Sequence, residues 1–434
     1  MLRNVDRIAA GLVMLMLVAS VASAIPPKSA YVVVKQGDAI GAETVSTLGA
    51  PFTDGNGKVG CVGSLSNSER FVWWDTGPVF LSGSLLPDVV TGGESTMGVG
   101  NNGEFIYSPS VNGNDSVVTH GGVLLQKGDP IVPLPGLYST FNSRPTMLPD
   151  GTAHWMGGST ATQGSSTSTN RHFFRATDPT DPNSITVLLS GGDVIEGKAI
   201  ATTASNFTYD FSDNGLHHLH KLDMATGSSS NNDHIYLNGV FVAQEGQPTG
   251  QGDNWQGFSA LSVNNAGNWV LAGDTDGPTA TDAFVAYNGA IQIREGDTID
   301  GITLASGAAI RDVSINNLDQ VVHLWGWGSG ASAQEYLFFG SATDLANSAM
   351  LLAIGDEIDV DGDLIADYAI ADFEASTVIG PGLDLGDDGY IYVEVGMVPV
   401  TGGDEIEAII RIAIPEPASL LLMAVGGLAL IRRR

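Results

Sequence analysis

The sequence predicts an all-β protein built from repeated units of four strands, and three observations support that prediction. The 434 residues include 56 glycines, and 43% of residues are hydrophobic while only 15% are charged. Such a chain is rich in turn formers and can pack a core. Two kinds of turn recur along it at intervals of about 45 to 65 residues, as repeated structural units do. A short strand-like run follows each turn of the second kind.

The two turns differ in pattern. The first reads Gly-Asp-x-Ile and has two degenerate copies around Gly83 and Gly246; the full copies begin at Gly37, Gly128, Gly192, Gly296 and Gly355. The second comes about twenty residues later in each repeat, and its copies end at Gly57, Gly103, Gly151, Gly215, Gly267, Asp319 and Gly389. Asn, Asp and Gly at these positions supply the positive φ of a tight hairpin.

The last repeat lacks a fourth strand, and the first residues of the mature chain supply one. Six repeats continue into a fourth strand, whereas the seventh ends at Ile414. Residues Tyr31 to Asp38 have the pattern of a fourth strand with no repeat before them. Complementary ends are typical of closed rings. The sequence therefore predicts a seven-bladed β-propeller of four-stranded blades over residues 25–414, closed by both termini. A ring of six or eight blades and two half-rings are the alternatives.

The charge of the chain excludes some classes of partner. A formal net charge of −30 argues against nucleic acid and anionic membrane surfaces, because Lys and Arg drive phosphate binding. It suits a secreted protein that contacts divalent cations. The single cysteine, Cys61, allows no intramolecular disulfide. We expect it to be a small buried residue in a strand.

The first 24 residues have the features of a secretory signal peptide. Arg3 and Arg7 precede an apolar run from Ile8, and Ala22 and Ala24 form an A-x-A cleavage pattern. We expect a signal helix that the secretion translocon and signal peptidase process. A retained N-terminal anchor is the weaker alternative, because the apolar run is short and ends in small residues.

Residues 415–434 form a three-part tail. Pro415, Glu416 and Pro417 come first, and the prolines keep the glutamate in extended, exposed backbone. An apolar run to Ile431 follows, of about 14 residues where a spanning helix needs about 20. Three arginines close the chain and fix its end on the cytoplasmic side. An ordinary single-pass anchor is the alternative reading.

This tail resembles the PEP-CTERM sorting signal of Gram-negative bacteria, which has the same three parts in the same order. The resemblance implies that an exosortase-type transpeptidase recognises Pro415, Glu416 and Pro417. It also implies transient inner-membrane anchoring by a short C-terminal hydrophobic transmembrane helix. Removal of the tail then delivers the protein to the cell surface, outer envelope or extracellular exopolysaccharide. None of the three residues is catalytic.

The second turn also resembles a tandem-repeat family of bacterial surface proteins, the choice-of-anchor proteins, whose repeat is written N-x-x-G-x-x-A-F. The copy "NNAGNWVL" keeps Asn264, Gly267 and an apolar pair. The copy "NNLDQVVH" keeps Asn316 but has Asp319 in place of Gly. No copy meets the full motif, and the resemblance implies no biochemical role.

One acidic loop is a candidate cation site. In "IDVDGDLIADY", Asp359, Asp361 and Asp363 alternate around a glycine, and Asp367 follows, which gives the carboxylate density that Ca²⁺ needs. The loop lacks the bidentate Glu of an EF-hand, and a solvated acidic loop is the alternative. In "LHHLHKL", His218 and His220 share one face of a strand. We expect them to be ordinary strand residues, since no Cys or Glu nearby completes a metal site.

Catalytic motifs are absent from the sequence. It contains no G-x-S-x-G, H-E-x-x-H, C-x-x-C or phosphate-binding loop. We therefore expect a non-catalytic propeller with a structural, adhesive or polysaccharide-binding role. The alternative is a secreted carbohydrate-active enzyme, a glycoside hydrolase or lyase, that uses acidic residues at the propeller mouth. Acids clustered with His or Arg at the mouth would favour the enzyme, and small and apolar residues there would favour the scaffold.

Overall fold

A computed structural model describes most of the chain between the two terminal segments. Its described residues are 26–54, 57–85, 90–91, 97–100, 102–132, 134–141, 145–163, 165, 168–202, 208–374 and 382–414. The expected signal helix with its cleavage residues lies outside these ranges, and so does the sorting tail with its hydrophobic helix. Among the described residues, no helix is both long and apolar enough to cross a membrane.

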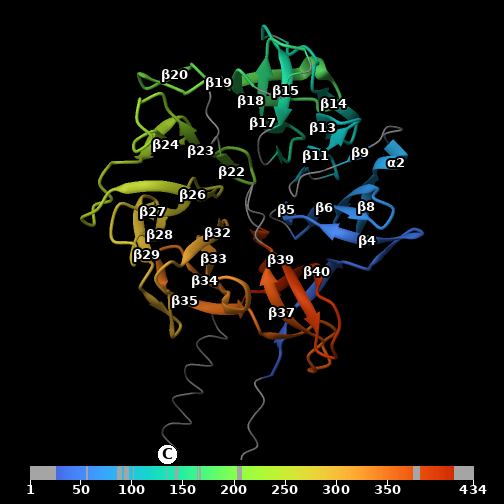
Figure 1. Cartoon of the computed structure of the whole chain (residues 1–434), viewed down its shortest axis with the longest axis vertical. Helices are drawn as coiled ribbons and strands as arrows, with labels where there is room; N and C mark the ends of the chain where they lie inside the picture. The colour runs from blue at the N-terminus through green and yellow to red at the C-terminus, as the bar shows by residue number, and fades with distance from the viewer. Residues whose placement is uncertain are drawn as a thin grey trace, which may run out of the picture.

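The described strands form a ring of sheets around a central axis, which is the arrangement of a β-propeller (Figure 1). Six sheets, named blades 1 to 6, each use one continuous stretch of chain, and a larger composite sheet joins the two ends. The expected seven blades of four strands are therefore wrong: the described chain has six blades of four to six strands beside one seven-stranded closing sheet. The sequence repeats did not predict these strand numbers, because loops divide several inner strands into two shorter strands. The pairs β4 and β5, β15 and β16, and β37 and β38 each share one neighbouring strand.

Blades 1 to 3 hold the following elements. Blade 1 contains β3 (Ala39–Ile40), β4 (Glu43–Leu48), β5 (Phe52–Thr53), β6 (Val59–Leu65), β7 (Arg70–Trp74) and β8 (Gly77–Leu81), and α2 (Ser82–Leu85) follows it. Blade 2 contains β9 (Val90–Thr91), β10 (Met97–Val99), β11 (Phe105–Tyr107), β12 (Ser110–Val111), β13 (Asn114–Thr119) and β14 (Gly122–Gln126). Blade 3 contains β15 (Leu137–Phe141), β16 (Thr146–Met147), β17 (Ala153–Thr160), β18 (Asn170–Ala176) and β19 (Ile185–Ser190), with η1 (Pro182–Ser184) before β19.

Blades 4 to 6 are four-stranded. Blade 4 contains β22 (Thr208–Phe211), β23 (His218–Asp223), β24 (Asp233–Leu237) and β25 (Val240–Gln244). Blade 5 contains β26 (Trp255–Val263), β27 (Trp269–Thr275), β28 (Ala283–Tyr287) and β29 (Ala290–Arg294). Blade 6 contains β32 (Ala309–Ile315), β33 (Gln320–Trp327), β34 (Gln334–Ser341) and β35 (Asp344–Ala353), with η2 (Gly330–Ser332) before β34.

The closing sheet and two hairpins complete the ring. The closing sheet contains β1 (Lys28–Ser29), β2 (Tyr31–Lys35), β36 (Glu357–Asp359), β37 (Tyr368–Phe373), β38 (Leu383–Leu385), β39 (Tyr390–Pro399) and β40 (Ile406–Ala413). The hairpins join β20 (Val194–Ile195) to β21 (Lys198–Ala199) and β30 (Thr298–Ile299) to β31 (Ile302–Thr303).

The closing sheet is held by strands from both ends of the described chain. β2 pairs with β40, with Tyr31 opposite Arg411. The Arg411 guanidinium lies 5.2 Å from the ring centre of Tyr31 and 4.9 Å from that of Tyr390. Val34 is fully buried and packs with Ile409 against blade 1. The prediction that the two ends of the chain complete one sheet is confirmed.

The Gly-Asp-x-Ile turns end the outer strands. In five copies the aspartate accepts a hydrogen bond from the backbone N–H three residues earlier; these are Asp38, Asp129, Asp193, Asp297 and Asp356. The degenerate copy around Gly83 is not such a turn, because α2 occupies it and Glu69 accepts the N–H of Gly83 instead. No aspartate follows Gly83 to cap the strand in the same way.

The second turns have the backbone that the sequence predicts. Their last residue has a positive φ in every copy: Gly57 99°, Gly103 82°, Gly151 82°, Gly215 68°, Gly267 79°, Asp319 54° and Gly389 86°. Asp319 therefore adopts the left-handed conformation without being glycine, as Asp does more readily than most residues.

The hydrophobic core is divided among the junctions between neighbouring sheets. Trp155 lies in the cluster between blades 2 and 3, and Trp325 lies between blades 5 and 6. Both are fully buried. Because both faces of each sheet are covered, the middle strands are buried on both sides, as the run Ile391–Met397 of β39 shows. The core thus forms between sheets and requires the ring to be closed.

The first asparagine of the Asn-x-x-Gly turns joins one blade to the next. Asn264 of blade 5 is buried, and its Oδ1 accepts the backbone N–H of Ala266 and Asn268 in its own turn, at 3.1 and 3.0 Å. Its Nδ2 donates to the carbonyl of Asn316 in blade 6, at 3.0 Å, and to Asp319 Oδ1, at 2.8 Å. The corresponding Asn316 shapes its own turn in the same way.

We predict that Asn264→Ala destabilises the protein by about 2 to 4 kcal/mol, because it leaves buried N–H groups without an acceptor and cuts the link to blade 6. Asn347→Ala is the control, since Asn347 is exposed and contacts only Asp344 through its side chain among the described residues. Urea unfolding followed by tryptophan fluorescence measures both. Equal losses for the two variants would contradict the structural role of Asn264.

Candidate functional site

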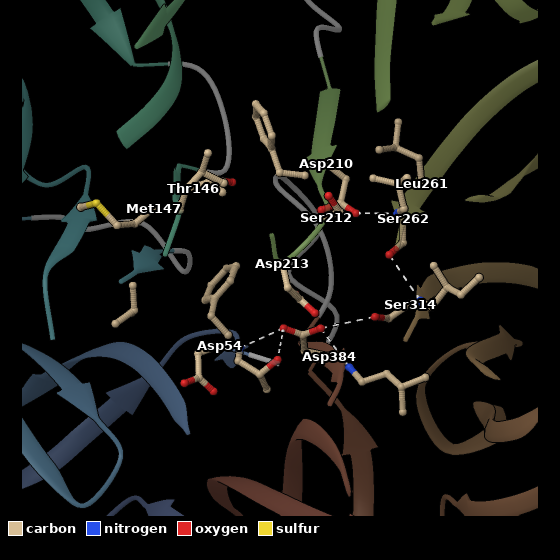
Figure 2. A pocket seen from close by; sticks show the side chains of 18 of the residues that line it. Asp54, Thr146, Met147, Asp210, Ser212, Asp213, Leu261, Ser262, Ser314 and Asp384 are labelled. Carbon is tan, nitrogen blue, oxygen red and sulfur yellow. Dashed lines mark hydrogen bonds between the residues drawn. The ribbon is translucent and has the colours of Figure 1, made fainter. Parts of the chain in front are cut away.

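A cavity of about 110 Å³ lies on the central axis, where the innermost strands of the blades and the closing sheet meet (Figure 2). Apolar and small side chains form most of its wall. Four acids also line it: Asp54, Asp210, Asp213 and Asp384. Among the described residues that line this cavity, none is Lys, Arg or His.

Two of these acids bind the neighbouring inner strands. Asp210 Oδ2 of blade 4 accepts the backbone N–H of Val263 in blade 5, at 2.8 Å. Asp384 Oδ2 of the closing sheet accepts the backbone N–H of Thr53 in blade 1, at 2.9 Å. Its Oδ1 accepts the Ser314 hydroxyl of blade 6, at 3.3 Å. Figure 2 shows these contacts crossing the gaps between sheets. Both carboxylates therefore act as links between sheets around the axis.

Asp213 has a different environment. The residue as a whole is exposed, and Asn317 Nδ2 donates to its carboxylate at 3.0 Å. Desolvation of the carboxyl group, followed by the nearby carboxylates of Asp384 and Asp387, raises the pKa of Asp213 to about 7. With that pKa, Asp213 is partly protonated at neutral pH.

The predicted calcium loop brings three of its four residues together. The carboxylates of Asp359, Asp361 and Asp363 lie within 4.8 Å of one another, whereas Asp367 stands outside this group. Asp367 instead accepts the backbone N–H of Val360, at 2.9 Å. Asp359 is buried and its two oxygens accept backbone N–H groups within the loop. The loop is thus folded around Asp359.

A second acidic cluster was not found from the sequence. Asp372, Glu374 and Glu405 also place their carboxylate oxygens within 4.8 Å of one another, and Glu394 and Glu407 lie beside them. None of these five forms an ion pair among the described residues. Three carboxylates at this spacing could hold a hard dication.

This cluster lies at the junction between the closing sheet and blade 1. Glu407 Oε2 accepts the backbone N–H of Leu48, at 2.8 Å. Glu394 is 5% exposed and lies close to Cys61 of blade 1. Burial of the Cys61 thiol, followed by the charge of Glu394, raises the pKa of that thiol. Cys61 is buried, as the sequence predicts.

Burial and like charge strongly change the acidity of this cluster. Burial, followed by the carboxylates of Glu374, Glu407 and Asp372, raises the pKa of Glu394 to about 8. Burial, followed by Asp372, Glu407, Glu405 and Glu335, raises the pKa of Glu374 to about 7. The patterns Asp-x-Glu at 372–374 and Glu-x-Glu at 405–407 were the available signals, because alternate strand residues share a face. Only the fold brings the two patterns together.

Comparison with known proteins identifies one segment of the chain. Residues 413–434 match the PEP-CTERM protein-sorting motif. The expected sorting signal is confirmed at the C-terminus. No curated protein matches the chain.

Some solved structures are similar to the chain at low identity. The chain is similar to the WD40 β-propeller domain of Doa1 (TM-score 0.42, 9% identity, 90% of this chain and 98% of that chain). It is similar to prolyl endopeptidases (TM-score 0.42, 10% identity, 88% of this chain), of which it spans 49%. A PL25 polysaccharide lyase, an ulvan lyase, is also similar (TM-score 0.40, 11% identity, 89% of this chain and 95% of that chain). Similarity at this level transfers no activity.

We predict that Glu394→Gln flattens the dependence of stability on pH. A glutamate with an ordinary pKa of 4.5 loses its proton in the unfolded chain, whereas folded Glu394 keeps its proton until about pH 8. Between these values the folded state binds more protons, so the free energy of unfolding of the wild type falls as pH rises. The variant, neutral throughout, is expected to be more stable than the wild type above about pH 8.

Urea midpoints at about pH 5, 6.5 and 8.5 test this prediction. Glu357→Gln is the matched control, since Glu357 is exposed. A wild-type stability that rises over this range, or an unchanged pH slope in Glu394→Gln, would show that Glu394 is ionised in the folded protein.

Proposed function

We propose that the chain is an exported surface protein whose propeller is carried to the cell envelope or extracellular matrix by C-terminal sorting. The match of residues 413–434 to the PEP-CTERM motif carries this proposal. Residues 1–24 serve as the signal peptide, which the secretion translocon and signal peptidase process. An exosortase-type transpeptidase recognises Pro415, Glu416 and Pro417, while the short hydrophobic helix holds the chain in the inner membrane until cleavage.

The propeller has a non-catalytic role, structural, adhesive or polysaccharide-binding. The axial cavity supports this part of the proposal, because it holds no basic side chain among its described residues and two of its acids accept backbone N–H groups of neighbouring sheets. The turn at Asn264 and Gly267 also resembles the N-x-x-G-x-x-A-F repeat of the choice-of-anchor proteins, which we propose as relatives.

A carbohydrate-active enzyme is the second candidate, and one observation favours it. Asp213, with a pKa of about 7, lies near Asp384. Glycosidases use a pair of carboxyl groups, one of which has a raised pKa. Against this, Asp384 already accepts three hydrogen bonds from Thr53 and Ser314, which hold it as a link between sheets.

Calcium binding at the acidic loop is a further part of the proposal. Asp359, Asp361 and Asp363 would supply carboxylate oxygens, and Asp367 would contribute by holding the end of the loop. Ca²⁺ there would stiffen a loop in the closing sheet without taking part in catalysis.

We predict that Glu416→Ala with Pro417→Ala blocks sorting. The wild type from its native envelope is expected to lack the arginine-ended tail by intact mass and to leave the inner membrane. The variant is expected to keep the tail and stay in that membrane, since the recognised backbone is lost. Ser419→Ala, outside the Pro-Glu-Pro sequence, is the control and should sort normally. A wild type that keeps its tail in the inner membrane would contradict the sorting role, and the acids of the mouth would then be assayed for hydrolysis.

We predict that Asp361→Asn with Asp363→Asn weakens Ca²⁺ binding at least tenfold, because two of three anionic ligands become neutral. Asn keeps the side-chain oxygen that accepts a backbone N–H at each position, so the loop should stay folded. Calorimetric titration of the full chain with CaCl₂ measures the effect, with the exposed Asp344→Asn as control. Equal binding by the wild type and the double variant would place any ion elsewhere, and Glu374→Gln with Glu405→Gln then tests the second cluster.

A further inference from the structure

A second cavity, of about 430 Å³, lies between blades 3 and 4. Ligand sites commonly measure about 300 to 1,000 Å³. β17, β18 and β19 form one wall, and β22 and β23 form the other. Leu188 at the rim is 39% exposed, which opens the cavity to solvent. The cavity at this junction is therefore large enough for a small ligand.

The histidines that the sequence singled out lie in this inter-blade pocket. His218 and His220 both line it, with ring centres 4.8 Å apart, as the strand alternation predicts. His217 is not among the lining residues and lies beside Asn238, with 2.9 Å between the side-chain nitrogens. His154 of blade 3 joins the pocket from the opposite wall and is 4% exposed.

Aromatic rings form the floor of the pocket. The ring of His154 lies 4.5 Å from that of Phe211, and Phe173 lies 4.9 Å from His220. Tyr236 also lines the pocket. These rings come from both blades, so the floor exists only when the blades are packed together. Ring faces of this kind stack against the apolar face of a sugar.

Three buried polar atoms of residues that line the pocket have no hydrogen-bond partner among the described residues: His154 Nδ1, His218 Nδ1 and Arg175 Nε. Buried polar atoms normally find a hydrogen-bond partner, so each unpaired atom requires an explanation. Arg175 is the cross-strand neighbour of His154, which places the guanidinium and the imidazole side by side. Asp150 at the rim is exposed and accepts the N–H of Thr152 in its own turn.

The described residues that line the pocket include one guanidinium, that of Arg175, and one carboxylate, that of Asp150 at the rim. Arg175 forms no ion pair among the described residues, although the chain is strongly acidic. Burial, followed by the positive charge of Arg175, lowers the pKa of His154 to about 3. Burial also lowers the pKa of His220 to about 3. The histidines are therefore neutral at pH 7 and can donate to or accept from hydroxyl groups.

The histidine nitrogens do not form a metal site. Among the described residues, those of His154, His218 and His220 do not form a group within 4.8 Å of one another. A ligand in this pocket therefore meets the guanidinium of Arg175, the imidazole rings of two histidines and the aromatic rings of the floor.

We propose that the pocket between blades 3 and 4 binds a uronate residue of an acidic polysaccharide. The carboxylate pairs with Arg175, the ring hydroxyls bond His154 and His218, and the sugar face stacks on Phe211. This proposal rests on the polysaccharide-binding role proposed above and names its ligand class. The net charge of −30 repels a polyanion at long range, but salt screens that repulsion beyond about 8 Å, so recognition occurs by contact.

Calorimetric titration of the full chain with glucuronate and with glucose tests the proposal. We expect glucuronate to bind and glucose to bind at least tenfold more weakly. Arg175→Gln should weaken glucuronate binding at least tenfold, because a charge-assisted hydrogen bond is lost. Arg175→Lys, which keeps the charge but loses the planar fork, should fall in between. Lys127→Gln removes the same charge outside the pocket and should bind as the wild type.

His154→Gln provides a second variant, with thermal unfolding as the check that each variant folds. We expect it to weaken glucuronate binding while the preference over glucose remains, because Arg175 still reads the carboxylate. Equal binding of glucuronate and glucose, or full binding by a folded Arg175→Gln variant, would overturn the proposal.

Co-sedimentation with polygalacturonate and with dextran separates this proposal from the general role of the propeller. If the wild type and Arg175→Gln both sediment with polygalacturonate equally, the pocket is not the site and the pocket proposal fails while polymer binding stands. If the wild type binds glucuronate but neither polymer, recognition of a uronate by the pocket stands, whereas its assignment to a polysaccharide and the polymer-binding role both fail.

Discussion

The pairing of β2 with β40 is the constraint on which the ring depends. Each hydrophobic cluster lies between two sheets, so no sheet has a core of its own. When β2 adds to β40, Val34 is carried against blade 1 and the last junction is filled. The two ends of the described chain are then held together by a contact between strands that are far apart in the sequence.

Hydrogen bonds around the axis complement the apolar junctions. Asn264 reaches from blade 5 to blade 6, Asp210 from blade 4 to blade 5, and Asp384 from the closing sheet to blade 1. Each link uses a polar side chain on an inner strand or its turn to accept or donate across a gap. A residue type that suggests catalysis in a sequence therefore has a structural use at this cavity. The same chemistry that makes an active site also holds neighbouring sheets in register.

Charge is distributed unevenly over the ring. The carboxylates of Asp210 and Asp384 at the axis accept hydrogen bonds from backbone N–H groups. Glu374 and Glu394 instead lie close together, with no basic side chain paired to them among the described residues. In the inter-blade pocket, Arg175 forms no ion pair among the described residues, although Asp150 lines the same pocket. These uncompensated groups mark places where a proton, a cation or an anion changes the energy most.

Local patterns in the sequence determined the turns, the all-β class, the complementary ends and the sorting tail. Gly267 and the Gly-Asp turns are predictable because backbone conformation depends on neighbours in the chain. The acidic loop is local as well, so Asp359, Asp361 and Asp363 meet as expected. Only the tertiary structure decided how inner strands split among blades, and it brought Glu394 to Glu374 and His154 to Phe211. Those contacts join segments distant in sequence, and their geometry depends on how whole sheets pack, which no short pattern encodes.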